Sequence, residues 1–175
     1  KGDQTGYSFT EEITPEALIK AAKTAANIAN ENRKVEPAKL EFQRTPNYYP
    51  TEVLWETVNI DQKIPFLQKL NNRLHEKEES IVKTRIWYGD VSKHVLVVNS
   101  EGGLVYDHRP MAEIHASCTA EKNGDREENS FSLTARKGME HFNDKNLEAV
   151  ADETVRRTMV LFDAVKPEAG EMEVV

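Results

Sequence analysis

The sequence predicts an α+β fold, in which a four-stranded antiparallel meander is covered on one face by two or three helices. Two observations lead to this prediction. Apolar residues recur at helical spacing in three segments, and between the second and third of these the spacing changes to the two-residue period of strands. The connections between the predicted strands are short, which is typical of antiparallel pairing.

The first helix is expected to begin after Thr14, a good N-cap residue, with Pro15 in the first turn. An alanine-rich face then recurs at helical spacing through residues 18–29, which permits close packing against a neighbour. Just before this helix, residues 6–10 alternate between apolar and small polar side chains. This alternation predicts a short strand or strand end.

Residues 30–59 form an irregular segment that contains prolines, and a loop of this length often has a function. A second helix follows, with Asp61 as its expected cap and Pro65 in its first turn. Its apolar stripe consists of Ile64, Leu67, Leu70 and Leu74.

Four strands are predicted next, and turn residues separate each from the following one. Gly89-Asp90 is expected to form the first turn, residues 100–103 the second and Asn123-Gly124 the third, the strongest hairpin signal in the chain. Pro110 should break or bulge the third strand. The strands cover residues 81–88, 93–99, 104–121 and 127–136.

The third strand alternates clearly, so its two faces can be assigned. We expect Ile114, Ala116, Cys118 and Ala120 to face the core, and Glu113, His115, Ser117 and Thr119 to face the other way. On the fourth strand, Phe131, Leu133 and Ala135 should share the apolar side.

The last predicted helix begins near Asp144, and Pro167 and Gly170 end it. Residues 170–175 then resemble the beginning of a strand. We therefore expect the chain to be one N-terminal-type domain, residues 1–175, of a larger protein whose catalytic C-terminal domain is absent.

Composition excludes several classes of protein. With 38% apolar and 30% charged residues the chain should form a folded core, and no apolar run is long enough to cross a membrane. A formal net charge of −7 without a basic stripe disfavours nucleic-acid binding. The single cysteine, Cys118, permits no internal disulfide, which favours a reducing, cytoplasmic location.

His108, His115 and Cys118 were weighed as zinc ligands, because zinc accepts histidine and cysteine. His115 and Cys118 are three residues apart on one strand and should point to opposite faces, which opposes chelation and also a Cys-His nucleophilic pair. No H-E-x-x-H or C-x-x-C motif is present. We therefore expect no catalytic residue and no metal ligand in this chain.

The polar face of the third and fourth strands allows two interpretations. It is either plain solvated surface or one wall of a cleft in a larger protein, and a free sheet edge can also accept an extended peptide. The candidate residues for such a substrate cleft are His108, Arg109, His115 and Ser117.

Several segments, in the right order along nearly the whole chain, resemble the TldD/PmbA family. They include residues 2–10 with the alanine-rich helix after them, and an N-S-x-G turn in residues 97–105. A D-x-R-P stretch at residues 107–110, an A-E-x-N-G end at residues 120–124 and the last helix with residues 161–175 complete the resemblance.

The resemblance implies a zinc metallopeptidase that acts on small or unstructured peptides, with two related subunits forming a hollow homo- or heterodimer. The family's older name, modulator of DNA gyrase, does not imply DNA binding. Its zinc motif, H-E-x-x-x-H with a later cysteine, lies in the C-terminal half, so no residue here inherits a ligand role. Shaping the peptide cleft and assembling the subunits are the expected tasks, with zinc only in the full-length parent.

Three hypotheses remain open from the sequence. The chain is the non-catalytic part of a zinc peptidase, inactive alone, or a stand-alone protein- or peptide-interaction module, or an independent hydrolase that uses Cys118 or His115.

Overall fold

A computed structural model describes residues 5–28, 36–165, 169–171 and 173 of the chain. By their internal contacts the residues divide into two compact units, Lys1–Lys39 and Leu40–Val175, and each is described by itself. The single N-terminal-type domain expected from the sequence stays a prediction. Most of the strand expected at residues 170–175 lies outside the described residues.

The first unit contains α1 (Pro15–Ile28), and Thr14 caps this helix through its side-chain oxygen, as predicted. The strand expected at residues 6–10 is wrong, because the segment pairs with no strand in the part of the chain that the structure describes. A Cβ at Gly6 would lie 1.9 Å from the Ala25 carbonyl oxygen, so the segment packs directly on α1. Its alternation therefore reflects packing against a helix.

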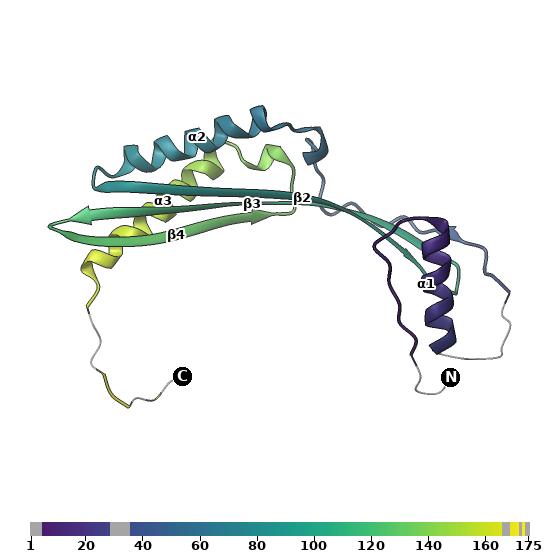
Figure 1. Ribbon diagram of the computed structural model, residues 1–175. Helices are drawn as coiled ribbons and strands as arrows, with labels where there is room; N and C mark the ends of the chain where they lie inside the picture. Colours follow the sequence, from purple (N-terminus) through teal and green to yellow (C-terminus); the bar gives the residue numbers. More distant parts are fainter. Residues whose placement is uncertain (1–4, 29–35, 166–168, 172, 174–175) are drawn as a thin grey trace. The chain divides into compact units, whose positions relative to one another are not determined.

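The second unit is built on a sheet with β3 at its centre (Figure 1). β2 pairs antiparallel with β3 along its whole length, and β4 pairs antiparallel with the C-terminal part of β3. The two-residue β1 pairs parallel with the beginning of β3, on the edge that β4 leaves free. The strands are β1 (Glu41–Phe42), β2 (Ile81–Val98), β3 (Gly103–Lys122) and β4 (Asp125–Ala135).

The predicted α+β class is confirmed, but the sheet is mixed rather than a pure antiparallel meander. Residues 81–88 and 93–99, predicted as two strands, form the single strand β2, and no turn occurs at Gly89-Asp90. Gly89 has a different role: a Cβ there would lie 2.8 Å from the indole of Trp87. The glycine makes room for this ring.

The break expected at Pro110 is also wrong, since β3 continues through it with Pro110 opposite Ser92. Pairing with β4 begins only at Ala112, so Pro110 lies where β3 is an edge strand on that side. A proline is tolerated at such a position because it interrupts no ladder. The hairpin predicted at Asn123-Gly124 is confirmed, and both residues have positive φ angles, 54° and 90°.

Two helices, α2 (Ile60–Lys77) and α3 (Asp144–Met159), cover one face of the sheet, as predicted. The cap expected at Asp61 is wrong by two residues: Asn59 caps α2 and forms a reciprocal capping box with Gln62. The side-chain oxygen of Asn143 caps α3.

The core lies between these helices and the face of β3 that the sequence predicted to be apolar. Ile114, Ala116, Cys118 and Ala120 are all at most 1% exposed, and Leu70 and Leu74 of α2 are fully buried. α3 contributes Leu147, Val150 and Ala151.

The long β2–β3 hairpin has two parts, and Figure 1 shows both strands running on beyond the helices. The covered half, residues 81–91 and 111–122, lies under α2 and α3. The extended half, residues 92–98 and 103–110, is flanked instead by β1 and by the irregular segment predicted at residues 30–59. The described part of that segment contains β1 and the short helix η1 (Trp55–Thr57).

Candidate functional site

The four residues predicted to line a substrate cleft are found in two different places. His108 and Arg109 line a pocket beside the extended half of the hairpin. His115 and Ser117 lie in the covered half, where the His115 ring is within 2.9 Å of the Ser132 hydroxyl of β4. The structure therefore brings together only the first pair.

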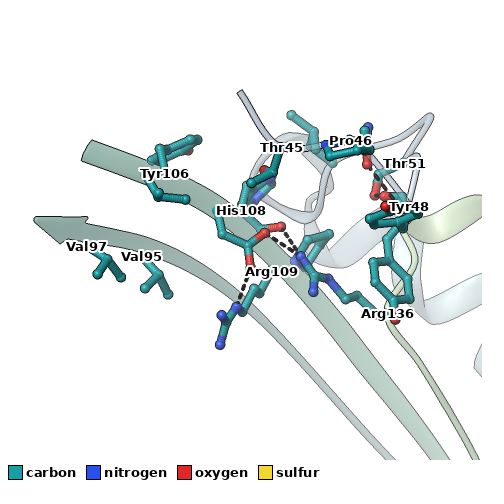
Figure 2. A pocket seen from close by; sticks show the side chains of 16 residues that line it. Thr45, Pro46, Tyr48, Thr51, Val95, Val97, Tyr106, His108, Arg109 and Arg136 are labelled. Carbon is teal, nitrogen blue, oxygen red and sulfur yellow. Dashed lines mark hydrogen bonds and ion pairs between the residues drawn. The ribbon is translucent and has the colours of Figure 1, made fainter. Parts of the chain in front are cut away.

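The pocket has a volume of about 580 Å³. It lies between β3 and the loop of residues 45–54, next to the edge of β3 that β4 has left (Figure 2). Its walls combine valines of both hairpin strands with tyrosines of the loop and with charged groups. The principal lining residues are Tyr48, Tyr49, Val95, Val97, Val105 and Arg136.

Arg136, just after β4, holds this region together. Its Nη2 donates to Asp107 Oδ1 over 2.6 Å and to the His108 carbonyl oxygen over 2.9 Å. The guanidinium also lies 4.4 Å from the ring centroid of Tyr49, a cation–π contact that fixes the loop. Asp107 also accepts from Arg109, and this bond, with that from Arg136, lowers the pKa of the Asp107 carboxyl below its ordinary value.

On the other side of His108, three metal-ligating side chains converge: Glu56 of η1, His94 of β2 and His108 of β3. His94 and His108 are register partners across the hairpin, and their rings stack with centroids 4.6 Å apart. Glu56 Oε1 lies 3.4 Å from His94 Nε2 and 3.2 Å from His108 Nε2. A hydrogen bond from Ser92, and after it smaller contributions that include His108, lower the pKa of Glu56.

An aromatic cluster holds η1, and with it Glu56, in place. Trp55 is 3% exposed and its indole N–H donates to the Lys137 carbonyl oxygen over 2.8 Å. Its ring centroid lies 5.8 Å from that of Tyr88 and 5.9 Å from that of Phe142. The residue next to this buried anchor is therefore directed at the hairpin.

Cys118 lies far from such a role. It is 1% exposed and its Sγ lies 3.1 Å from the Thr158 hydroxyl of α3. Burial raises the pKa of its thiol, which opposes formation of the nucleophilic thiolate. Because His115 is on the opposite face of β3, the structure gives no support to the hydrolase hypothesis that uses these two residues.

Residues 54–162 match the family model described as the PmbA/TldA metallopeptidase central domain. This match covers more than half of the chain. The chain belongs to the TldD/PmbA family. The sequence analysis assigned the whole chain to the N-terminal portion of the family, and the matched model refines this placement, because it describes a central domain.

Two relatives carry the name metalloprotease TldD homolog. The one from Haemophilus influenzae is 26% identical over 99% of this chain, and the one from Buchnera aphidicola is 27% identical over 72% of it. The chain spans only 38% and 26% of the lengths of these TldD/PmbA proteins. No helix among the described residues is both long and apolar enough to cross a membrane.

Solved structures of the family share the fold. A protein from Thermotoga maritima named as a modulator of a DNA gyrase aligns over 97% of this chain and 38% of its own, with a TM-score of 0.66 and 17% identity. TldE from Thermococcus kodakarensis aligns over 88% of this chain and 34% of its own, with a TM-score of 0.57 and 16% identity.

The relatives' name implies a metal in the full-length family. This chain contains no H-E-x-x-H or H-E-x-x-x-H motif. Among the described residues, one group of three ligand types converges, and its two histidines and one glutamate are a donor set that zinc accepts. Sequence reasoning missed Glu56 and His94, although the pairing of His94 with His108 followed from the length of the hairpin once its turn was placed at residues 100–103.

Proposed function

We propose that this chain is a non-catalytic part of a TldD/PmbA zinc metallopeptidase that degrades or processes small unstructured peptides. Within that enzyme its tasks are to shape the peptide cleft and to support the assembly of two homologous subunits. The family membership and the relatives' name support the metallopeptidase. The bound zinc would polarise the peptide carbonyl and activate a water molecule.

The observation that carries the cleft assignment is the pocket beside the extended half of the hairpin. Its volume of about 580 Å³ is within the usual range for ligand sites. Val95, Val97 and Val105 offer an apolar wall for side chains of any sequence, while Arg109 and Arg136 offer cations to a peptide carboxylate. Such a mixture suits peptides of varied sequence better than one specific ligand.

Arg109 gives the sharpest test of this assignment, because its side chain is half exposed and lines the pocket. A fluorescently labelled unstructured peptide with a free C-terminal carboxylate should bind the 175-residue chain, and Arg109→Ala should weaken binding at least about fivefold through the lost charge-assisted contact. Anisotropy titration measures both.

Arg126→Ala is the matched control. Arg126 is also an exposed arginine paired with a nearby carboxylate, Glu121, but it lies in the β3–β4 hairpin away from the pocket lining. Equal affinity of the two variants would contradict the cleft assignment. Reading the encoding gene decides the wider function: an H-E-x-x-x-H motif beyond Val175 supports the peptidase, and a gene without one supports the stand-alone interaction module.

A further inference from the structure

Glu56, His94 and His108 come from three separate elements, and their ligand atoms lie within 4.8 Å of one another. A tetrahedral zinc site with bonds of about 2.0–2.2 Å places its ligand atoms about 3.3 Å apart. Glu56 Oε1 is 3.4 Å from His94 Nε2 and 3.2 Å from His108 Nε2, so both separations already match the edges of such a tetrahedron.

Neighbouring hydroxyl groups orient two of these ligands. Tyr106 Oη lies 2.6 Å from His94 Nδ1, and when Nδ1 carries the proton it donates to Tyr106 and leaves the Nε2 lone pair directed at Glu56. Ser92 donates to Glu56 and lies 2.6 Å from His108 Nε2. Hydrogen bonds of this kind around the ligands are typical of metal sites, where they fix the tautomer and the ring.

Burial and exposure in the cluster also suit an accessible ion. The side chain of His108 is 23% exposed, that of Glu56 is 40% exposed and that of His94 is 57% exposed. Trp55 anchors Glu56 from behind, while His94 has room to move. An ion held here would keep an open position toward solvent, beside the pocket that His108 also lines.

We propose that Glu56, His94 and His108 bind one divalent transition-metal ion of the zinc type, with water in the fourth position. This reverses the expectation from the sequence that the chain supplies no metal ligand. The two imidazole planes are 6° from parallel, and parallel rings cannot both direct a lone pair at one ion. Binding therefore requires one ring to rotate, and the more exposed His94 is the one that turns.

Cation binding here does not depend on the proposed peptidase function, since it concerns only these three side chains. The test is zinc titration of the chelator-treated 175-residue chain by calorimetry, together with the visible absorption spectrum of the cobalt-substituted chain. We expect one equivalent per chain and a tetrahedral cobalt spectrum. Affinity should fall as the pH falls, because the ligands must be deprotonated to bind.

Single variants identify the ligands. Glu56→Gln, His94→Gln and His108→Gln should each lower zinc affinity at least about tenfold, and Tyr106→Phe by about tenfold or more through loss of orientation. His115→Gln is the control, because His115 also lies on β3 beside a serine but outside the cluster.

Two results would overturn the proposal. One is a wild-type chain that takes up no zinc and gives no tetrahedral cobalt spectrum. The other is zinc affinity that is the same in the three ligand variants as in His115→Gln, which would place the ion elsewhere. Far-ultraviolet circular dichroism of every variant shows whether it is folded, and the wild-type measurement is decisive by itself.

Discussion

In the covered half of the β2–β3 hairpin, the side chains of β3 that face α2 and α3 are small or aliphatic and fully buried. In the extended half the same face of the two strands carries His94, Tyr106 and His108. One continuous register connects the two halves, and the alternation of faces does not change between them. What changes is the cover: two helices over one half, and η1 with a loop beside the other.

This difference shows how one pair of strands can serve both stability and function. A helix-covered face must be apolar, because each polar group buried there would need a partner. Beyond the helices that requirement ends, and groups that bind ligands can occupy the same face. Stability should therefore depend on the covered half, and ligand binding on the extended half.

The largest expected effect is on the covered half. Leu70→Ala removes a fully buried side chain between α2 and the sheet and should lower the free energy of unfolding by about 2–5 kcal/mol. Leu96→Ala, at a 63% exposed position of the extended half, should change it by no more than about 0.5 kcal/mol. Urea denaturation of both variants measures this, and equal losses would remove the distinction between the halves.

A smaller effect is expected where the two halves meet. Trp55→Phe removes the indole N–H that donates to the Lys137 carbonyl, and the unfolding free energy should fall by about 1–2 kcal/mol. Trp87→Phe is the control, because Trp87 is 55% exposed on the open face of the sheet. If the control variant loses as much stability as Trp55→Phe, then the buried hydrogen bond is not what anchors η1.

The smallest effect belongs to the extended half and depends on pH. Arg109 and then Arg136 lower the folded-state pKa of Asp107 below its ordinary value of 3.8. A lowered folded pKa stabilises the fold above the ordinary value, and this stabilisation is lost as the pH falls through the lowered one.

Asp107→Asn should therefore be less stable than wild type at neutral pH, and the two should converge in strong acid. Urea midpoints measured across the acid range test this. Added salt should shrink the difference, because the group is near the surface. A gap between the two proteins that widens with acidification would show that the ion pairs do not act in this way.

Local pattern was enough to predict much of the covered half. The alternation of residues 113–120, the hairpin at Asn123-Gly124 and the apolar stripe of α2 were all confirmed, because each depends on residues close together in sequence. The turn predicted at Gly89 was wrong because its glycine serves a neighbouring indole, which a turn signal cannot reveal. The cap of α2 was misplaced by two residues, since Asn59 and Asp61 are both good caps.

The candidate site was less predictable. His108 and Arg109 were found by their resemblance to a family motif, and they do line the pocket. His115 and Ser117 were assigned to the same cleft because they share the polar parity of β3 with Arg109, yet the pocket follows the free edge of the extended half instead. Glu56 carried no local signal at all, being one carboxylate within an irregular segment.

The sequence by itself determined the α+β class, the buried face of β3 and the family, because these follow from side-chain periodicity and from ordered local motifs. Only the tertiary structure decided that β2 runs unbroken past the helices and that His94 therefore lies opposite His108. It also decided that a buried tryptophan brings Glu56 to them. Contacts between residues tens of positions apart depend on register and packing, and neither is encoded in any short stretch of sequence.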